Sequence, residues 1–582
     1  MITLDIETHP IEDGAPLLPK PVGIALRYPS RLKQYYSFGH PTGNNCTLDE
    51  ARAVVVSIWG SEILTHNGLT FDIPVLTHHF DLPERNPLLT HDTLFLSYLH
   101  DPHARSLSLK DLAGDWLNIP PSERDELFDW IVKNVPGATR KTAGAYICRA
   151  PGELAGRYAM ADVELTYRLF EYVHPLVTST MQGAYDRERR LAPVLADLQN
   201  TGVLCDVPRL RDDLEVATHR LGNLDNEVRI MLNAPTLNPG SNDELVDALK
   251  KNGYSGFLQT PKGADSANKK SLDHALAQNP ALRAALTGRN TLATLTGTFM
   301  RPWMEIATAN KGRIHAAYNQ VRNPEGFGTR TGRLSSSRPN FQNIPGFLGP
   351  EFPLMKSYLY PDEGHVWTKG DFMAQEPRLA AHFEDGALCR AFNENPLLDP
   401  YIFVKDAIGG GITRKESKNV FLGLLYAMGV AALAAKIECT EARATMLRNM
   451  IRAALPDIVR LDAECKRRFK LGASVCTLGG RHYFCEPPKN GRTWEYKALN
   501  SLIQGSAADQ TKEAIIFADH EIKLLDKSCR ILGTVHDEIS ISHPPEFEKQ
   551  VHEIMQLAAN ALPCDVPMMM EIHTGYRWAE AA

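Results

Sequence analysis

The chain has 582 residues, of which 43% are apolar and 23% charged, with a formal net charge of −6. It is too long for one hydrophobic core, so we expect several domains. No apolar run approaches the roughly 18 residues of a membrane span, and the N-terminus lacks the basic and apolar regions of a signal peptide, so we expect a cytoplasmic protein without membrane association.

A strand is predicted at the N-terminus, because residues 2–7 alternate between apolar and polar side chains. Asp5 and Glu7 then project from the same face. Two adjacent carboxylates repel each other unless a cation lies between them, and oxygen ligands of this kind suit magnesium or manganese. An exposed strand face would also explain the pair.

Two later segments add further acids. Asp72 follows the polar turn 66–71, and Tyr158 and Asp162 stand four residues apart in a helical segment. That spacing places the phenol and the carboxylate on one helix face. By itself, Asp72 would be an ordinary residue at a helix start.

Together these segments resemble the DEDD exonuclease superfamily, in the subgroup with a tyrosine in its third motif, over about residues 1–175. The resemblance implies a ribonuclease-H-like fold for residues 1–180. It also implies that Asp5, Glu7, Asp72 and Asp162 hold two divalent ions and that Tyr158 orients the attacking water. The same fold with an inactive site is the alternative.

The next segments are predicted to be helical. A helix that begins near Asp186 is expected to end at Thr201, with Gly202 as its C-terminal cap. The amphipathic patterns that follow indicate a helical arm with loops at its tip.

Basic side chains gather between Arg313 and Phe341, which predicts a local path for DNA, although a solvated basic loop would look similar. The overlapping run 328–345 is rich in hydroxyl and amide donors, which suit phosphates. Further on, a predicted strand ends at Asp371, and a predicted hairpin carries Asp537 at its tip. Acids at the ends of adjacent strands can meet even when they are distant in sequence. Each acid alone would be an ordinary turn aspartate.

A helix is predicted between these two acids. Arg414, Lys418, Leu422 and Tyr426 recur every four residues and form one stripe. Two cations suit a triphosphate, and the ring can stack on a base pair. A plain amphipathic helix would show the same pattern.

The segments around 328–345, 371–378, 414–426 and 530–542 resemble the motifs of family A (DNA polymerase I type) DNA polymerases. The resemblance implies a right-hand polymerase domain over residues 181–582, with a thumb at about 181–312, a palm at about 313–400 and 511–582, and fingers at about 401–510. The expected fold class is therefore multi-domain, α/β and α+β.

The implied activity is template-directed addition of deoxynucleotides to a primer, with 3′→5′ proofreading. Two Mg²⁺ ions per site are expected, with Mn²⁺ as a substitute. The polymerase residues that the match implies are, for catalysis and metal binding, Asp371, Phe372 through its carbonyl, Asp537 and Glu538; for the nucleotide, Gln375, Glu376, Arg414, Lys418, Leu422 and Tyr426; and for DNA, Arg333, Asn343, Asn500, Gln504 and His536. Glu376 would exclude a ribose 2′-hydroxyl.

Three features depart from the family pattern: Leu422 replaces the usual Phe or Tyr, Tyr496 replaces a common Arg, and residues 372–375 differ from the usual motif. The compact plan resembles replicative polymerases of bacteriophages. Expected partners are primer-template DNA, deoxynucleoside triphosphates and replisome proteins such as a helicase and a single-strand binding protein, with the chain itself a monomer.

Three alternatives stay open at this point. The chain could be a nuclease whose second half only binds DNA, a non-catalytic replisome scaffold, or a single-subunit RNA polymerase. The retained acids oppose the first two alternatives, and Glu376 together with the exonuclease segment opposes the third.

Overall fold

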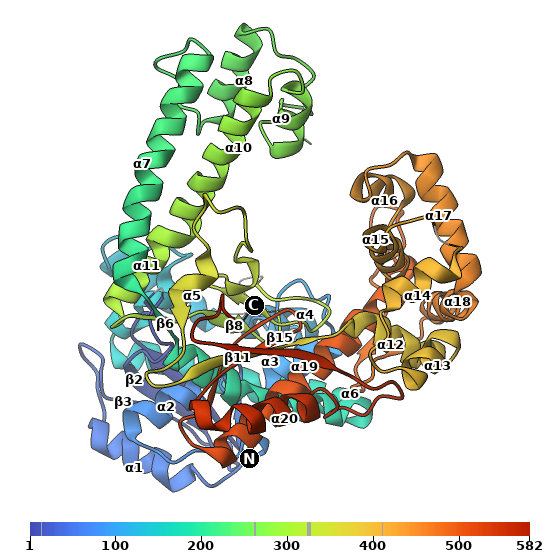
Figure 1. The fold of residues 1–582 in the computed structure, drawn as a ribbon. Coiled ribbons are helices and arrows are strands. Elements are labelled where there is room, and N and C mark those ends of the chain that lie inside the picture. The colour runs from blue at the N-terminus through green and yellow to red at the C-terminus, as the bar shows by residue number, and fades with distance from the viewer. Residues whose placement is uncertain (13, 121, 261–262, 323–326, 410, 582) are drawn as a thin grey trace.

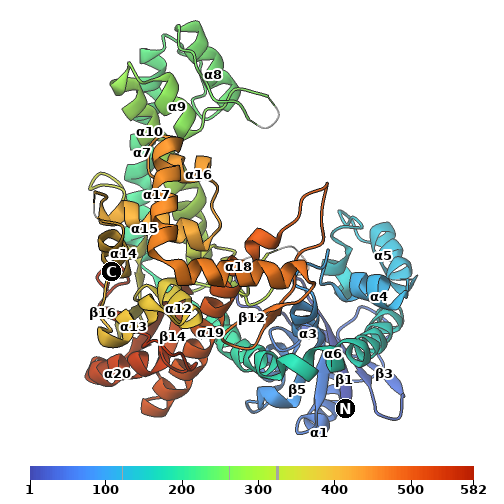
Figure 2. The ribbon, with the colours of Figure 1, turned by 90° about the vertical axis from the view of Figure 1, so that its right-hand side faces the viewer.

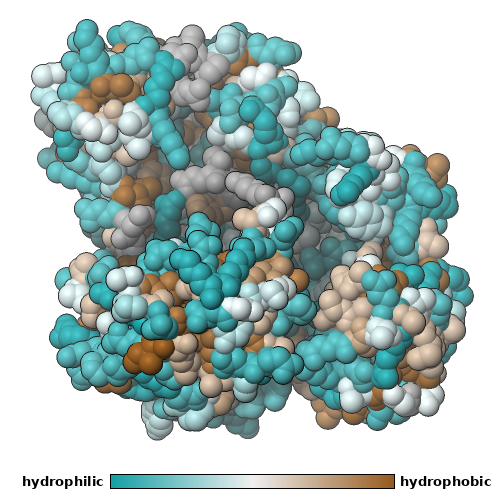
Figure 3. Space-filling view, turned by 90° about the horizontal axis from the view of Figure 1, so that it is seen from above, coloured by the Kyte–Doolittle hydropathy of each residue, from teal (hydrophilic) through white to brown (hydrophobic). Residues whose placement is uncertain are grey.

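The computed structural model describes residues 1–12, 14–120, 122–260, 263–322, 327–409 and 411–581. Two helical arms rise from a common base, and the N-terminal sheet lies within that base (Figure 1). Seen from above, the surface is mostly hydrophilic, with apolar residues in separate small groups (Figure 3). Within the described ranges, the structure has no helix that is long and apolar enough to cross a membrane.

The N-terminal part is built on a five-stranded sheet with the order β3-β2-β1-β4-β5. The first three strands pair antiparallel, whereas β1, β4 and β5 run parallel. The strands are β1 (Ile2–Thr8), β2 (Pro21–Arg27), β3 (Lys33–Ser37), β4 (Ile63–Thr65) and β5 (Thr90–Asp92). The predicted N-terminal strand is therefore present, and it lies at the centre of the sheet.

Helices cover both faces of this sheet. They are α1 (Leu48–Ile58), α2 (Asp72–Phe80), α3 (Thr93–His100), α4 (Leu109–Leu117) and α5 (Ser122–Asn134), together with the long α6. The alternation in β1 predicts one buried face, but nearly all of the strand is buried. The apolar side packs on α1 and α2, and the side that carries the acids packs toward α6. A strand buried on both faces can still alternate when its polar face lines a site.

The helix α6 (Gly152–Thr201) joins the two halves of the molecule. It contains a kink at Met181, where φ is −126°, next to the boundary expected at residue 180. Its end at Gly202, where φ is +68°, agrees with the predicted cap. A buried ion pair of 2.7 Å between Glu188 and Lys512 ties α6 to α19 (Ala498–Leu525). Figure 2 shows α6 running from the N-terminal sheet toward α19.

The first arm is formed by the helices that follow the short strand β6 (Val203–Cys205). The arm consists of α7 (Val207–Met231), α8 (Asn242–Lys251), α9 (Lys269–Ala275), α10 (Pro280–Thr294), a π-helical turn (Leu295–Met300) and α11 (Arg301–Ala309). An apolar cluster of its own, which includes Leu245, Leu272 and Leu286, holds the tip together. The arm with a looped tip agrees with the prediction for this region.

The base contains a four-stranded antiparallel sheet with the order β14-β15-β11-β16. The strands are β11 (Val366–Phe372), β14 (Arg530–Val535), β15 (Glu538–His543) and β16 (Met570–Gly575), and α20 (Glu548–Ala558) packs beside them. The predicted strand that ends near Asp371 and the predicted hairpin are both present. Because β11 pairs directly with β15, Asp371 near the end of β11 lies beside Asp537 in the turn that precedes β15.

Short strand pairs connect the base to the other parts. They are β6 (Val203–Cys205), β7 (Arg313–Ile314) and β10 (Leu359–Tyr360) in one sheet, β8 (Ala317–Asn319) with β9 (Ser335–Ser337), and β12 (Val475–Cys476) with β13 (His482–Tyr483). The pair β8 and β9 lies next to the N-terminal half, because Val321 shares an apolar cluster with α3 and α6.

The second arm is a group of helices around one apolar cluster, which includes Phe392, Val404, Phe421 and Ile451. The helices are α12 (Gln375–Glu384), α13 (Ala387–Glu394), α14 (Pro400–Ala407), α15 (Arg414–Leu425), α16 (Val430–Lys436), α17 (Glu441–Ala454) and α18 (Pro456–Lys470). The predicted helix at 414–426 is therefore present as α15, and Tyr426 is its C-terminal cap.

Candidate active sites

The four acids predicted for the N-terminal half come from three elements. Asp5 and Glu7 lie on β1, Asp72 is the first residue of α2, and Asp162 lies in the first half of α6. The carboxylate of Asp72 accepts a hydrogen bond of 3.0 Å from the backbone N–H of Ile6, which lies between the other two acids. Strand β1 and helix α2 are thereby joined at the acids.

Burial and mutual repulsion govern the charges of this group. Burial raises the pKa of Asp5 to about 7, partly offset by Lys110. It also raises the pKa of Glu7 well above its usual value, and the nearby Asp5 and Asp72 raise it further. The pKa of Asp72 is raised by burial and by Asp5. These carboxylates therefore repel one another, and nearby cations do not fully balance their negative charge.

Lys110 is the cation that lies among these acids, and the sequence reasoning missed it. Its ammonium contacts the carboxylate of Asp162 and lies 4.5 Å from the centre of the Tyr158 ring, and its side chain is 7% exposed. A lysine in the first turn of a helix opposes the helix dipole, and Lys110 is the second residue of α4. This unfavourable position is the feature of the sequence that could have indicated a functional lysine.

Asp92 stabilises the turn before Asp72, and the sequence analysis did not single it out. Its fully buried carboxylate accepts backbone hydrogen bonds from Asn67 at 2.8 Å, Leu69 at 3.2 Å and Leu94 at 2.9 Å. Burial raises its pKa to about 6 despite these bonds. It thus fixes the turn that leads into Asp72, and only the three-dimensional structure reveals this function.

The two acids predicted for the second half meet where the two central strands of the base sheet, β11 and β15, end and begin. Asp371 pairs in register with Glu538, and the N–H of Phe372 donates a 3.3 Å hydrogen bond to the carbonyl of Asp537. Burial raises the pKa of Asp371 to about 6, with added repulsion from Asp537 and Glu538. Burial also raises the pKa of Asp537. The hairpin therefore brings the three acids into one electrostatic group.

Glu538 has a different environment from the other two acids. Its carboxylate accepts a 2.7 Å hydrogen bond from the indole of Trp578, and the ammonium groups of Lys356 and Lys369 lie 3.5 and 3.6 Å away. It is 4% exposed. Glu538 is thus held by internal partners beneath the pair Asp371 and Asp537.

Three predicted residues from distant segments are in direct contact. The guanidinium of Arg333 and the hydroxyl of Tyr426 each donate a hydrogen bond to a different oxygen of Glu376. Burial and the charge of Glu376 raise the pKa of Tyr426 far above its usual value. The contact links the start of α12 with the end of α15 beside Asp537, whose pKa Arg333 lowers.

The other predicted residues of α15 face a ring that the sequence reasoning did not single out. The guanidinium of Arg414 lies 5.4 Å and the ammonium of Lys418 lies 5.5 Å from the centre of the Tyr401 ring. Arg414 also forms a 2.5 Å ion pair with Asp399. Leu422 is partly buried against the apolar cluster of the second arm.

Gln375 and His536, two further predicted contacts, differ in how exposed they are. Gln375 is 5% exposed and donates to the carbonyl of Ala507 at 3.2 Å. It nevertheless lines a small pocket together with Arg333, His536 and Asp537. His536 is exposed at the hairpin tip.

The predicted DNA contacts on α19 and near β9 are placed as follows. Asn500 and Gln504 lie one turn apart on α19, and both are partly exposed. The buried side-chain oxygen of Asn500 has no hydrogen-bond partner among the described residues. Asn343 is exposed at the end of a short 3₁₀ turn, Phe341–Asn343.

Two arginines of the basic stretch between Arg313 and Phe341 have internal partners. Arg313 forms a 2.8 Å ion pair with Asp362. Arg322 donates hydrogen bonds of 2.6 Å to the carbonyls of Ala104 and Arg105. Sequence alone could not show these partners, because they lie far away along the chain.

Both acid groups suit a divalent metal by the chemistry of their donors. Carboxylate oxygens are the ligands that hard cations prefer, and the raised pKa values reflect negative charge that a cation would balance. As placed, however, no three His, Cys, Asp or Glu side chains of the described ranges are arranged to hold a metal ion. In the N-terminal group Lys110 contributes the positive charge instead.

Comparison with known families gives two matches. Residues 209–580, more than half of the chain, match DNA polymerase family A. Residues 53–178 match a 3′-5′ exonuclease family. The second match includes Asp72, Tyr158 and Asp162 but begins after Asp5 and Glu7.

Several relatives have similar sequences. A DNA-directed DNA polymerase of Pseudomonas phage M6 is 26% identical over 501 residues, which cover 74% of this chain and 71% of the relative. The DNA polymerase DpoZ of Salmonella phage PMBT28 is 27% identical over 589 residues, covering 92% and 90%. DNA polymerase I of Treponema pallidum is 25% identical over 552 residues, covering 90% of this chain but 52% of the relative. The chain therefore spans about half the length of that bacterial relative.

A solved structure has the same fold. It is the POL domain of Pol1 from M. smegmatis in complex with DNA primer-template and dNTP, and the likeness has a TM-score of 0.78 at 20% identity, covering 100% of this chain and 96% of that one. This likeness and the two family matches confirm the predicted fold class.

Proposed function

Because this chain belongs to DNA polymerase family A and carries a 3′-5′ exonuclease segment, we propose that it extends a primer on a DNA template and shortens the same primer at a second site. The observation that carries the proposal is the presence of two separate groups of acids, one in each half, whose members are partly or fully buried. Each group is gathered from distant segments, and each has raised pKa values.

Asp371, Asp537 and the backbone carbonyl of Phe372 would hold two Mg²⁺ ions in the polymerase half, with Mn²⁺ as a substitute. Such ions, when bound, lower the pKa of the attacking hydroxyl and neutralise the triphosphate. The protein itself keeps the two carboxylates side by side, at the end of β11 and in the turn before β15. Glu538 supports them from beneath through its bonds to Trp578 and the two lysines.

The nucleotide would lie between the second arm and the base sheet. Arg414 and Lys418 supply positive charge for the triphosphate, and Tyr401 keeps both side chains on one side of α15. Tyr426 presents its ring to the new base pair, with Leu422 one turn away. Glu376 holds Arg333 and Tyr426 together, and from this position it would exclude a ribose 2′-hydroxyl. Gln375 orients this region through its bond to Ala507.

The primer-template would contact side chains on both sides of the acids. Arg333 and His536 lie next to Asp537 and suit the primer terminus. Asn500 and Gln504 can donate to the acceptors that every correct base pair shares in the minor groove. Asn343, at the edge of the first arm, suits a backbone contact.

In the exonuclease half, Asp5, Glu7, Asp72 and Asp162 would hold two divalent ions, and Tyr158 would orient the water that attacks the terminal phosphodiester. Lys110 contacts Asp162, so a divalent ion would compete with its ammonium for that carboxylate. We further propose a replicative function, with a helicase and a single-strand binding protein as partners, for a monomer in the bacterial cytoplasm that is encoded by a phage.

A 5′-labelled primer annealed to a template tests the proposal directly on a denaturing gel. With magnesium we expect extension in the presence of the four deoxynucleotides and shortening in their absence, and EDTA should stop both reactions. Shortening in both lanes would reduce the protein to a nuclease. No change in either lane would favour the scaffold alternative.

A further inference from the structure

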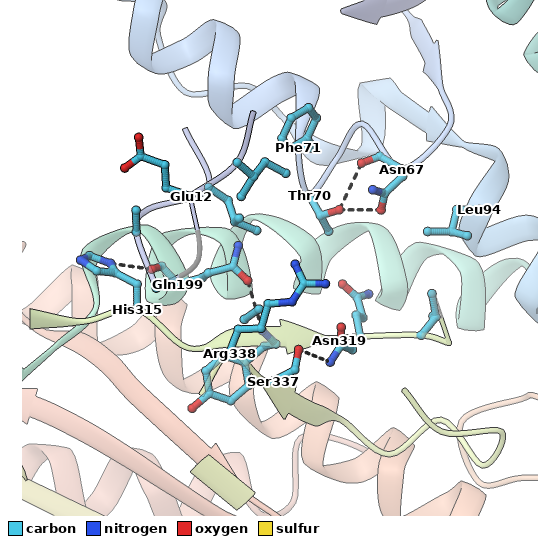
Figure 4. A pocket seen from close by; sticks show the side chains of 18 of the residues that line it. Glu12, Asn67, Thr70, Phe71, Leu94, Gln199, His315, Asn319, Ser337 and Arg338 are labelled. Atoms are coloured by element: carbon cyan, nitrogen blue, oxygen red, sulfur yellow. Dashed lines mark hydrogen bonds between the residues drawn. The ribbon is translucent and has the colours of Figure 1, made fainter. Parts of the chain in front are cut away.

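The exonuclease half and the strand pair β8 and β9 face each other across a cavity. In Figure 4, Asn67 and Thr70 lie on the exonuclease side, and Asn319, the last residue of β8, lies on the other side. Val321 follows β8 and belongs to the same apolar cluster as Leu94 of α3. The two halves are therefore in direct contact immediately after β8.

Arg322, the next residue, binds the exonuclease half through its partly buried guanidinium. It donates hydrogen bonds of 2.6 Å to the carbonyls of both Ala104 and Arg105. These carbonyls belong to residues 101–108, which connect α3 with α4 and which we call the α3–α4 segment. The rigid fork of a guanidinium suits two neighbouring acceptors. One side chain of the polymerase half thus holds two consecutive peptide groups of the exonuclease half.

Two further contacts from the polymerase half reach the same region. The hydroxyl of Tyr98, on α3, donates a 3.2 Å hydrogen bond to the carbonyl of Thr329. The carboxylate of Glu486 lies 4.0 Å from the imidazole of His103, which is too long for a hydrogen bond. Burial lowers the pKa of His103, so this pair carries little charge at neutral pH. Arg322, with two charge-assisted bonds, is the strongest of the three contacts.

The α3–α4 segment leads directly to a cation of the exonuclease site. Ser108 ends the segment, and its hydroxyl accepts a 3.3 Å hydrogen bond from the N–H of Asp111, which caps α4. Lys110, the second residue of α4, contacts the carboxylate of Asp162. Helix α4 also packs on α6. Release of the segment should therefore loosen Lys110 without unfolding the helix.

The segment also contacts the turn before Asp72. The carbonyl of Leu107 accepts a 3.2 Å hydrogen bond from Nε2 of His66, because a carbonyl oxygen can only accept. His66 begins the polar turn 66–71 that leads to Asp72. Through Lys110 and His66, the α3–α4 segment thus adjoins two separate parts of the exonuclease site.

On its other side, Arg322 belongs to a part of the chain that is fixed within the polymerase half. The side chain of Gln320 donates a 2.6 Å hydrogen bond to Glu188 of α6, and its carbonyl accepts a 3.1 Å bond from Lys512 of α19. All three residues are buried. A buried and connected polar network is rigid. Arg322 therefore holds the α3–α4 segment from a rigid base two residues away.

We propose that Arg322 is a positioning residue for the exonuclease reaction, because it fixes the α3–α4 segment from the polymerase half and thereby keeps Lys110 and the turn before Asp72 in place. The inference rests on the proposed function and adds that the exonuclease site depends on a side chain of the other half. The two hydrogen bonds of Arg322 go to the segment and not to the acids. Arg322 therefore acts through the segment.

The test uses the full chain with Arg322→Gln and Arg322→Lys, and with Arg390→Gln, at an exposed position on α13, as the control for a lost charge. Each protein receives a short 5′-labelled single strand at a series of concentrations, which reports shortening alone, and a matched primer-template, which reports extension. Hydrogen exchange of backbone amides, followed by mass spectrometry, reports local opening of the α3–α4 segment without any reaction.

For Arg322→Gln we expect the amides of the α3–α4 segment to exchange about tenfold faster, because two charge-assisted bonds are lost, while those of α20 stay unchanged. The maximal rate of shortening should fall about fivefold, with KM within about twofold, because the strand does not bind Arg322 itself. Extension should keep the parent rate. Arg322→Lys should recover part of both effects, since an ammonium can still donate to one carbonyl, and Arg390→Gln should behave like the parent.

Four results would overturn the inference. An unchanged maximal rate of shortening in Arg322→Gln is the first, and a lower rate with unchanged exchange of the α3–α4 segment is the second. A higher KM at an unchanged maximal rate would instead assign Arg322 to strand binding. A parallel loss of extension, with faster exchange in α20 as well, would assign it to the stability of the whole fold. Failure of the proposed function looks different, because the parent protein would then shorten no strand.

Discussion

The two groups of acids differ in how their charge is balanced. The exonuclease group encloses a lysine: Lys110 contacts Asp162 and offsets part of the rise that burial causes in the pKa of Asp5 and Glu7. In the polymerase group, the two nearby lysines form ion pairs with Glu538. Asp371 and Asp537 remain partly exposed. The two groups therefore differ in their electrostatics: the first has an internal cation in place, and the second has two carboxylates that are partly exposed.

The largest effect on stability is expected from removing the internal cation. Lys110→Met leaves the buried acids without a positive charge, and breaking a buried ion pair costs about 3 kcal/mol. The melting temperature in EDTA should therefore fall by several degrees, and magnesium should restore much of it because metal binds the folded state. Lys133→Met, an exposed position on α5, serves as the control. Equal melting of Lys110→Met and the parent in EDTA would contradict this account of the exonuclease group.

The polymerase group depends instead on the support of its hairpin. Asp362 accepts from Arg530 at 2.5 Å and from Arg313 at 2.8 Å, at the opposite end of β14 from the acids. Burial raises the pKa of Asp362, but the two guanidinium groups outweigh burial and lower the pKa to about 2. The stabilisation is thus fully present above pH 4 and is lost as the pH falls through about 2.

Asp362→Asn should therefore lower the free energy of unfolding by about 2 kcal/mol at neutral pH. The difference from the parent should shrink between pH 4 and pH 2. Urea unfolding followed by circular dichroism at several pH values measures it. A difference that stays constant down to pH 2 would show that the charge of Asp362 is not what stabilises the hairpin.

A smaller effect is expected at the contact among Arg333, Glu376 and Tyr426. Glu376→Ala opens space beside Tyr426, so the ratio of ribonucleotide to deoxynucleotide incorporation should rise about tenfold. Competition between the two nucleotides at one template position measures the ratio. Glu394→Ala, an exposed acid on α13, should leave it unchanged. An unchanged ratio in Glu376→Ala would remove Glu376 from sugar selection.

The smallest change is expected at Leu422, one turn before Tyr426 on α15. Leu422→Phe adds an aromatic ring where the chain departs from its family, and the use of dideoxynucleotides should change by a few-fold relative to deoxynucleotides. Single-turnover incorporation of each nucleotide gives the two rates. Identical rates in parent and variant would show that this position does not contact the sugar.

Much of the fold follows from local patterns in the sequence. Strand β1, the cap at Gly202, the hairpin of β14 and β15, and helix α15 are each encoded by residues close together in the chain. The strand end at Asp371 and the hairpin tip at Asp537 also follow, but only the resemblance to the family motifs distinguishes these two acids from ordinary turn aspartates.

Contacts between distant segments could not be predicted in the same way. Lys110 reaches Asp162 across 52 residues, and Arg313 pairs with Asp362 across 49. Nor does a pattern of basic residues reveal which ones are neutralised inside the protein. The sequence thus predicts the acids more reliably than the cations that surround them.

The most direct test of two separate sites compares Asp371→Asn with Asp5→Asn on one labelled primer-template. We expect Asp371→Asn to lose extension by roughly a thousandfold, since a lost metal ligand removes several kcal/mol of transition-state stabilisation, while shortening stays near the parent rate. Asp5→Asn should show the reverse. Loss of both activities in either variant would contradict the assignment of one reaction to each group of acids.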